Sequence, residues 1–259
     1  MKLLILTVCV LFGLAFAAPQ PKVVNGTDAS IQEFPSMVSL RRNNGHSCGG
    51  TILNEWWVLT AAHCVQNSAS GYSIQYGETV LNPTSENVVG VEAVYPHEFY
   101  NPSNQYINDI ALVKVSSPMS NQLFNYKAKL PAKGSFYMTG TPAVLAGWGR
   151  NGTDAPVQST LQKVDLQVYS ASDCDAIHNA KVHSTNICGG VEGGYQGQCN
   201  GDSGGPLFVN GVQVGIVSWS VKPCTVPPYP GVYTAVAPYI DWIQERTGIN
   251  FKLNMFVQA

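Results

Sequence analysis

The sequence Cys-Asn-Gly-Asp-Ser-Gly-Gly-Pro at residues 199–206 places one serine, Ser203, among three glycines. Glycine reaches positive φ at low steric cost, and Asp and Ser side chains bond to nearby backbone, so such a cluster is typical of a turn. The same serine would also suit nucleophilic catalysis if a base stood beside it. The rest of the chain decides between these two interpretations.

The N-terminus carries a short apolar run that follows Lys2 and ends at Ala17. A membrane span needs roughly 20 apolar residues, so this run is too short to be one. Small residues at positions 15 and 17 fit the cleavage rule of secretory signals. We therefore expect residues 1–17 to be a signal peptide, and the protein to be secreted, extracellular and without a membrane partner.

The composition points away from nucleic acid. Charged residues make up 12% of the 259 residues, and the formal net charge is −2. Soluble domains usually carry about 25% charged residues. A nearly neutral chain gives no reason to expect a nucleic-acid partner. The length suits one large β domain or two smaller halves that share a core.

Seven cysteines are present, and Cys9 lies in the expected signal peptide. An even number in an exported chain predicts disulfides. The alternative, a zinc site, lacks the short Cys-x-x-Cys or paired Cys/His spacing that it requires. The sequence alone leaves many pairings open, and nearest-neighbour pairing is the simplest. The six remaining cysteines are Cys48, Cys64, Cys174, Cys188, Cys199 and Cys224.

Short apolar runs alternate with turn residues along the chain. The clearest runs are 36–40, 56–59, 110–115 and 143–146, and Asn210–Gly211 predicts a hairpin turn between two further runs. This spacing favours an all-β sandwich or barrel. A helix is predicted only at 238–246, where the pattern begins with Pro and stops before Gly248.

Residues 201–205 also fit the G-x-S-x-G pattern of α/β-hydrolases. That motif needs a helix after the serine and a histidine later in the chain. Here Pro206 follows instead, and the chain has no histidine after His183. The hydrolase order is therefore excluded, and any catalytic histidine must precede Ser203.

His63 is the candidate base among the five histidines. It ends the apolar run 56–62 and directly precedes Cys64, so a strand and a disulfide can hold its ring rigidly. Asp109 is the candidate acid because it stands at the start of the apolar run 110–113, where a carboxylate is costly unless it is hydrogen-bonded. The resulting order is His63, Asp109, Ser203.

At these residues the sequence resembles the chymotrypsin/trypsin family of serine proteases. Residues 60–64, 109–112 and 201–206 resemble its three signature blocks, and further landmarks lie at 48–50, 146–149, 218–219 and 230–233. The resemblance runs from Val23 to about Gly248. It implies an all-β fold of two six-stranded antiparallel β-barrels with a C-terminal helix, with the active site between the barrels. It also implies three disulfides, which are Cys48–Cys64, Cys174–Cys188 and Cys199–Cys224.

The resemblance gives roles to the site residues. Ser203 would be the nucleophile, His63 the base and Asp109 the acid that orients it, with the N–H groups of Gly201 and Ser203 forming the oxyanion hole. Ser218 would support Asp109. No cofactor is implied. The only acids near the family's calcium loop are Glu78 and Glu86, and since hard cations need several oxygen ligands, we expect no metal.

The resemblance also predicts a zymogen. Cleavage after Lys22 would remove residues 18–22 and start the protease domain, 23–259, at Val23, whose ammonium group would pair with Asp202. Asn25 departs from the family, which usually has Gly there. In the uncleaved chain, Ser39 and His46 match positions that can hold the aspartate instead. Asn25 and Asn151 begin glycosylation sequons. We expect a trypsin-like activating protease.

The primary specificity pocket would be built from Gly197, Gln198, Ser218, Trp219, Ser220 and Gly231. No acid lies at 196–201 or 218–233, so a buried Lys or Arg of a substrate would stay unpaired. Ser220 is small and Gly231 has no side chain, so we expect a pocket open to Phe, Tyr, Leu or Met. Gln198 could shorten its floor or bond a polar side chain, and Ser220 could narrow its entrance.

The sequence therefore predicts a secreted, chymotrypsin-like serine endopeptidase. The alternatives are an elastase-like enzyme, a narrow-specificity processing protease and a catalytically silent binding homologue. The expected partners are protein or peptide substrates and protein protease inhibitors, and the expected state is a monomer.

Overall fold

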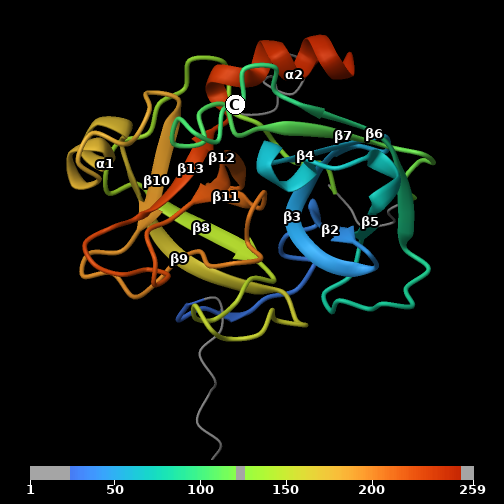
Figure 1. The fold of residues 1–259 in the computed structure, drawn as a ribbon, viewed down its shortest axis with the longest axis horizontal. Coiled ribbons are helices and arrows are strands. Elements are labelled where there is room, and N and C mark those ends of the chain that lie inside the picture. Colours follow the sequence, from blue (N-terminus) through green and yellow to red (C-terminus); the bar gives the residue numbers. More distant parts are fainter. Residues whose placement is uncertain (1–23, 121–125, 252–259) are drawn as a thin grey trace, which may run out of the picture.

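The computed structural model describes residues 24–120 and 126–251 and contains two antiparallel β-barrels side by side (Figure 1). The first barrel closes in the order β2-β3-β4-β7-β6-β5. Its strands are β2 (Met37–Arg42), β3 (Gly45–Asn54), β4 (Trp57–Thr60), β5 (Tyr72–Tyr76), β6 (Val88–Pro96) and β7 (Ala111–Val115).

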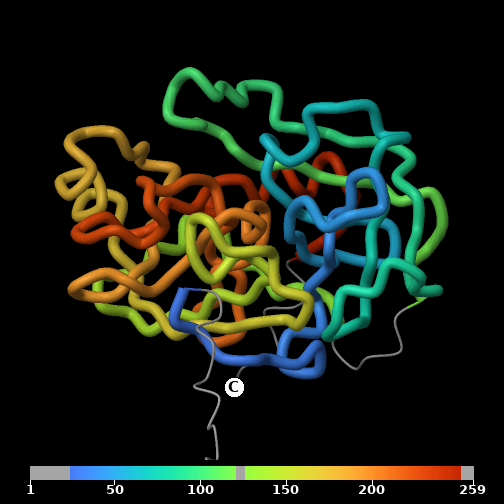
Figure 2. The backbone as a smooth tube through the Cα atoms, turned by 60° about the horizontal axis from the view of Figure 1, so that its bottom comes forward, coloured from blue at the N-terminus to red at the C-terminus, as the bar shows by residue number. Residues whose placement is uncertain are grey.

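The second barrel closes in the order β8-β9-β10-β13-β12-β11, through the pairing of β8 with both β9 and β11. A short extra strand, β1 (Thr27–Asp28), pairs with β9. Figure 2 shows the same two halves from a second direction, with the first barrel in blue to green and the second in yellow to red. The barrel strands are β8 (Pro142–Gly147), β9 (Gln162–Tyr169), β10 (Asn186–Gly190), β11 (Pro206–Val209), β12 (Val212–Trp219) and β13 (Gly231–Ala235).

The expected fold of two six-stranded barrels is confirmed, and the strand patterns explain it. In β9, the side chains of Val164, Leu166 and Val168 are buried, while those between them are exposed or half-buried, as the two-residue period of a strand requires. The predicted hairpin joins β11 to β12, and both Asn210 and Gly211 adopt the positive φ that such a turn requires.

The predicted C-terminal helix is also confirmed. It is α2 (Ile240–Thr247), preceded by the 3₁₀ turn Ala237–Tyr239, and it ends at Gly248 with a φ of 72°. Two buried residues of α2, Ile240 and Ile243, pack against the core of the first barrel. The C-terminal helix α2 therefore packs against the first barrel, although it follows the second barrel in the sequence.

The helix α1 (Ala171–Ile177) was not predicted. The Ser170 hydroxyl caps it by accepting a hydrogen bond from the Asp173 N–H, and Cys174 is its only buried residue. The helix is therefore held by a cap and by the Cys174–Cys188 disulfide rather than by an apolar stripe. Two further 3₁₀ turns are Ala62–Val65 and Ala69–Gly71.

The structure forms the three disulfides that the resemblance implied, Cys48–Cys64, Cys174–Cys188 and Cys199–Cys224. Ile249 and Phe251, at the start of the C-terminal tail, pack against the core of the first barrel. The expected signal peptide and propeptide, Val23 and the rest of the tail lie outside the described residues. Among the described residues, no helix is long and apolar enough to cross a membrane.

Candidate active site

His63 and Asp109 come from the first barrel. His63 lies in the 3₁₀ turn Ala62–Val65, which follows β4, and the neighbouring Cys64 is bonded to Cys48 of β3. Asp109 lies shortly before β7. Since β4 and β7 pair directly, with Thr60 opposite Ala111, the ends of these two strands bring the histidine and the aspartate together.

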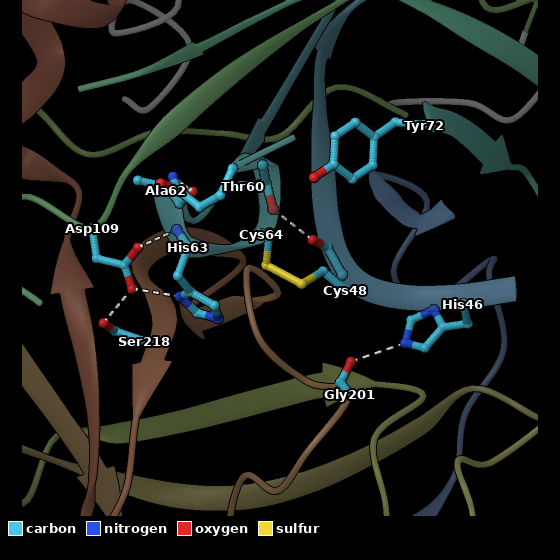
Figure 3. Close-up of a disulfide and its surroundings, with 12 residues drawn as sticks. His46, Cys48, Thr60, Ala62, His63, Cys64, Tyr72, Asp109, Gly201 and Ser218 are labelled. Carbon is cyan, nitrogen blue, oxygen red and sulfur yellow. Dashed lines mark hydrogen bonds and ion pairs between the residues drawn. A yellow bond between two sulfur atoms is a disulfide. The ribbon is translucent and has the colours of Figure 1, made fainter. Parts of the chain in front are cut away.

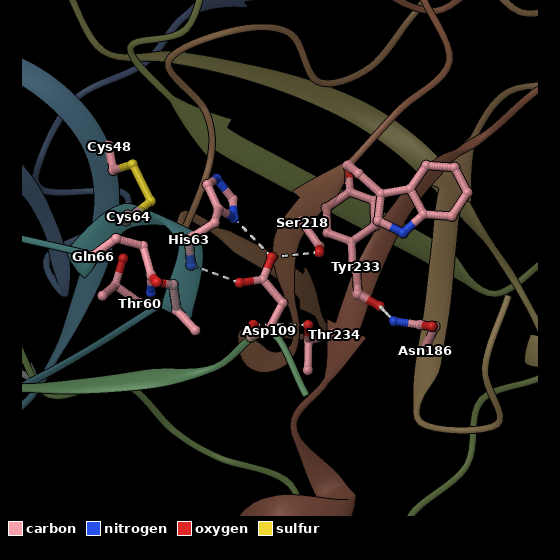
Figure 4. Close-up of polar contacts among 12 residues, drawn as sticks. Cys48, Thr60, His63, Cys64, Gln66, Asp109, Asn186, Ser218, Tyr233 and Thr234 are labelled. Atoms are coloured by element: carbon pink, nitrogen blue, oxygen red, sulfur yellow. Dashed lines mark hydrogen bonds and ion pairs between the residues drawn. A yellow bond between two sulfur atoms is a disulfide. The ribbon is translucent and has the colours of Figure 1, made fainter. Parts of the chain in front are cut away.

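The Asp109 carboxylate is fully buried and accepts hydrogen bonds from three donors (Figures 3 and 4). Its Oδ2 lies 2.7 Å from His63 Nδ1 and 2.6 Å from Ser218 Oγ, and its Oδ1 accepts the His63 backbone N–H at 2.9 Å. A carboxylate only accepts hydrogen bonds, so Nδ1 of His63 must carry a proton. In the neutral ring Nε2 is then the basic nitrogen.

Ser203 lines the same cleft as His63, a cavity of about 330 Å³. The loop that carries the serine is bonded to the first barrel, because the Gly49 N–H of β3 donates to the Ser203 carbonyl at 2.8 Å. Gly204, with φ of 77°, lies against β3 so closely that a Cβ would come within 2.6 Å of the Gly49 carbonyl oxygen. The glycine after the serine therefore permits the two barrels to meet.

Gly201 has a φ of 97°, and its carbonyl accepts a hydrogen bond from His46 Nε2 at 2.9 Å (Figure 3). His46 Nδ1 lies 2.8 Å from Ser39 Oγ and accepts a hydrogen bond from this hydroxyl, since Nε2 is the donor nitrogen. Burial lowers the pKa of His46, which keeps the ring neutral. Within the described residues, the N–H groups of Gly201 and Ser203 donate to no other group.

The expectation that Ser39 and His46 hold Asp202 concerns the uncleaved chain and stays a prediction. The two residues do form a hydrogen-bonded pair, but in this structure they hold the carbonyl of Gly201 rather than the carboxylate of Asp202. The Asp202 carboxylate accepts its hydrogen bonds here from the backbone of Gly149 and Cys199.

Asp202 is fully buried, and two backbone N–H groups donate to it, Gly149 at 2.8 Å and Cys199 at 3.0 Å. Burial raises its pKa to about 7, more than the two hydrogen bonds can offset. No ion pair joins Asp202 to another described residue. Its expected partner, Val23, lies outside the described residues.

The pocket differs from the expected open one. Gln198 is only 3% exposed, and its side chain lies against Gly231, where a Cβ would be 2.7 Å from Gln198 Cδ. Its Nε2 donates to the Trp219 carbonyl at 2.7 Å. Gln198, Ser218, Trp219 and Ser220 line the cleft, but Gly197 and Gly231 do not. The long side chain of Gln198 therefore covers Gly231, in keeping with the expectation that this residue could shorten the pocket floor.

The sequence predicts no role for three residues that line the cleft, Tyr106, Asn200 and Lys222. Tyr106, with φ of 55°, places its ring edge-on to His63 at a centroid distance of 6.0 Å. Lys222 donates from Nζ to Asn200 Oδ1 at 2.8 Å beside the cleft. The only sequence signals are that Tyr106 closely precedes Asp109 and that Asn200 and Lys222 lie near cysteines.

Both sequon asparagines lie among the described residues, and so do two clusters of His and Cys side chains that could be considered as metal ligands. Asn25 is exposed and donates from Nδ2 to the Tyr195 carbonyl at 3.1 Å, whereas Asn151 is half-buried. Among the described residues, the two clusters of His and Cys atoms close enough to share an ion both contain cysteines that are already in disulfides.

Known proteins match this chain over nearly its whole described length. The trypsin family model matches residues 23–243. Chymotrypsin-2 from Vespa crabro is 40% identical over 225 residues, which cover 86% of this chain and 99% of that protein. Trypsin from Xenopus laevis is 36% identical over 256 residues, covering 96% and 100%. Kallikrein-7 from Homo sapiens is 33% identical over 225 residues, covering 86% and 87%.

The range matched by the family model includes every strand of both barrels as well as His63, Asp109 and Ser203. A relationship of this extent shows that the chain belongs to the trypsin family of serine endopeptidases.

Proposed function

We propose that the protein is a secreted serine endopeptidase, made as a zymogen, in which Ser203, His63 and Asp109 form the catalytic triad. The observation that carries the assignment is the buried Asp109 carboxylate, bonded to His63 Nδ1 in the cleft that Ser203 lines. A buried carboxylate with three donors is a rigid anchor for an imidazole, and family membership supplies the reaction class.

The proposed reaction proceeds through an acyl-enzyme. Ser203 Oγ attacks the peptide carbonyl while His63 Nε2 takes its proton, and the imidazolium then gives that proton to the departing amine. Water enters next, loses a proton to the same nitrogen and attacks the ester, which releases the acid and restores Ser203. Asp109 stays ionised throughout and stabilises the imidazolium.

The N–H groups of Gly201 and Ser203 would bind the oxygen that becomes negative in the tetrahedral intermediate. The support for this role is that the His46 bond turns the Gly201 carbonyl away, and that neither N–H donates elsewhere within the described residues. Ser218, Trp219 and Ser220, at the end of β12, would bind the substrate backbone as an added strand.

A serine-directed organophosphate tests the assignment against the alternative of a silent binding homologue. We expect stoichiometric labelling of the activated protein at Ser203, located by peptide mapping. An activated protein that folds but takes up no label at this residue would favour the binding homologue.

Activation is proposed to follow cleavage after Lys22, which frees the Val23 ammonium group for Asp202. The support is electrostatic. Asp202 is buried with a pKa of about 7, so its hydrogen bonds do not fully offset the cost of burying the ionised carboxylate. A cation beside it would stabilise the charged form. N-terminal sequencing of the active form is expected to begin at Val23, and Lys22→Gln should block activation by a trypsin-like protease while Lys22→Arg permits it. Any other starting residue in the active form contradicts the proposal.

The pKa of Asp202 also predicts how the stability of the uncleaved chain depends on pH. Because folding raises this pKa from 3.8 to about 7, the contribution of the group to stability is fully present below the lower value and is lost as the pH rises through the higher one. Between about pH 4 and about pH 8, the uncleaved Ser203→Ala protein should therefore lose melting temperature relative to its Asp202→Asn counterpart, and the difference should correspond to a few kcal/mol of stability. After cleavage, the ammonium partner should flatten this dependence.

Asp202→Asn in the same background is the control for the pH experiment, because the amide does not titrate. The uncleaved Asp202→Asn protein should show the flatter profile too. Equal slopes in the uncleaved, cleaved and Asp202→Asn proteins would show that Asp202 does not govern this pH range.

For specificity, we propose cleavage after large apolar residues, namely Phe, Tyr, Leu or Met. The support is the lack of an acid among the described residues that line the cleft, so an arginine of the substrate would enter with its charge unpaired. Lys222, beside the cleft, would repel such a charge further. The names of the relatives do not distinguish between the two specificities, since trypsins and a chymotrypsin match this chain at similar identity.

Matched peptide substrates that differ only in the residue before the cleaved bond test this prediction. We expect the highest kcat/KM within the apolar set. Faster cleavage after Arg or Lys would overturn it and point to a trypsin-like processing enzyme. A maximum at Ala or Val would support the elastase-like alternative, for which the covered Gly231 is the favouring observation.

A further inference from the structure

Gln198 connects two walls of the pocket. The side chain comes from the segment before the nucleophile, and its Nε2 donates to the carbonyl of Trp219 at the end of β12. On the other side it packs on Gly231, the first residue of β13, where a Cβ would lie 2.7 Å from Gln198 Cδ and 2.9 Å from Cγ. The amide therefore spans the space between two neighbouring strands.

This conformation is held by both contacts. Gln198 is 3% exposed, and its Oε1 has no hydrogen-bond partner among the described residues. An unpaired buried amide oxygen is costly, so the side chain is kept in place by its packing and by the Trp219 bond rather than by its own oxygen. Swinging the side chain out of the pocket would break the one hydrogen bond that the amide makes within the described chain.

The space beneath Gln198 is closed. The cleft is lined by Gln198 itself and by β12 residues that include Val217 and Trp219, but not by Gly197 or Gly231. Gly197 is buried. A substrate side chain that enters along β12 therefore meets the Gln198 side chain before it can reach either glycine.

This inference rests on the proposed endopeptidase function and narrows its substrate class. We propose that the Gln198 side chain is the floor of the primary pocket, so that the enzyme selects Leu and Met over Phe, Tyr and Trp. A leucine side chain ends well short of the depth that an aromatic ring reaches, and methionine is flexible enough to bend over a raised floor. A ring would have to displace a packed and hydrogen-bonded side chain, and overpacking of this kind is unfavourable.

The experiment compares kcat/KM for peptides that carry Leu, Met, Phe or Tyr before the cleaved bond and are otherwise identical. The wild-type enzyme should favour Leu over Phe by roughly tenfold or more. Gln198→Ser removes the floor and exposes Gly231, so it should invert the ratio. Gln198→Met keeps the length of the side chain but loses the hydrogen bond to Trp219, so its ratio should lie between those of the wild type and Gln198→Ser.

Active-site titration with the organophosphate separates the two possible failures. If none of the activated forms is labelled, the proposed function fails. If the wild type is labelled and cleaves after Phe at least as fast as after Leu, the floor does not exist and the inference fails. A Gln198→Ser enzyme with an unchanged ratio also overturns it, and so does a Gln198→Met enzyme that favours Phe over Leu more strongly than Gln198→Ser does. The melting temperature of each variant shows whether it is folded.

Discussion

Ser203→Ala is expected to lower the turnover of the activated protein by about a million-fold, the loss known for removal of this nucleophile in serine proteases. The alanine has no atom to form the acyl bond, and the remaining catalysis would come from the oxyanion hole and substrate binding alone. His63→Ala should lose about as much. Turnover is measured with a peptide substrate after activation by an added protease that is then removed.

The triad also predicts non-additivity. Because Ser203 and His63 act as one unit, the double variant should be no slower than either single variant. Ser172→Ala, on the exposed side of α1, is the control and should keep full activity. A loss of only a few-fold in Ser203→Ala, in a protein with an unchanged melting temperature, would remove Ser203 from the mechanism.

Asp109→Asn is expected to lower turnover by roughly ten-thousand-fold, the effect known for this substitution in the family's triad. Oδ2 of Asp109 accepts from both His63 Nδ1 and Ser218 Oγ. An amide nitrogen at that position donates instead, so His63 would have to turn Nδ1 into an acceptor and carry its proton on Nε2. That nitrogen could then no longer take the proton of Ser203.

Asp241→Asn is the matched control for Asp109→Asn. Asp241 pairs with Lys133 on the surface and is 63% exposed, so its loss should leave turnover unchanged. Because the defect in Asp109→Asn lies in the state of the histidine, turnover should be lost with little change in KM. A variant that keeps turnover within tenfold of wild type would contradict the role given to Asp109.

Much of the fold could be predicted because it depends on local patterns. The runs that became β2, β4, β7 and β8 are apolar and bounded by turn residues, and Gly248 ends α2 where its position in the sequence predicts. Helix α1 was not predicted because its stability comes from a cap and from a disulfide to Cys188, which lies outside the helix. Its own sequence presents only one buried side chain, which is too little for a periodic pattern.

The site divides in the same way. His63, Asp109 and Ser203 could be chosen from the chain because each stands next to an apolar run or in a glycine cluster. The position of the Gln198 side chain could not be predicted, since it depends on Gly231 and on the Trp219 carbonyl, which come from two other strands. Likewise, the hydrogen bond from His46 to the Gly201 carbonyl could not be predicted, because it depends on how the loop that carries Gly201 folds.

The three disulfides have a consequence for any later cut in the chain. They join residues only 16, 14 and 25 positions apart, and each lies within one half of the molecule. A single nick between Cys64 and Cys174 would therefore leave the fragment with His63 and the fragment with Ser203 attached only by non-covalent contacts. In denaturant they would separate without any reducing agent. A nick inside the 199–224 loop would leave the two pieces joined by the Cys199–Cys224 disulfide, so they would separate only after a thiol was added. Gel mobility with and without reductant thus records where the molecule has been cut.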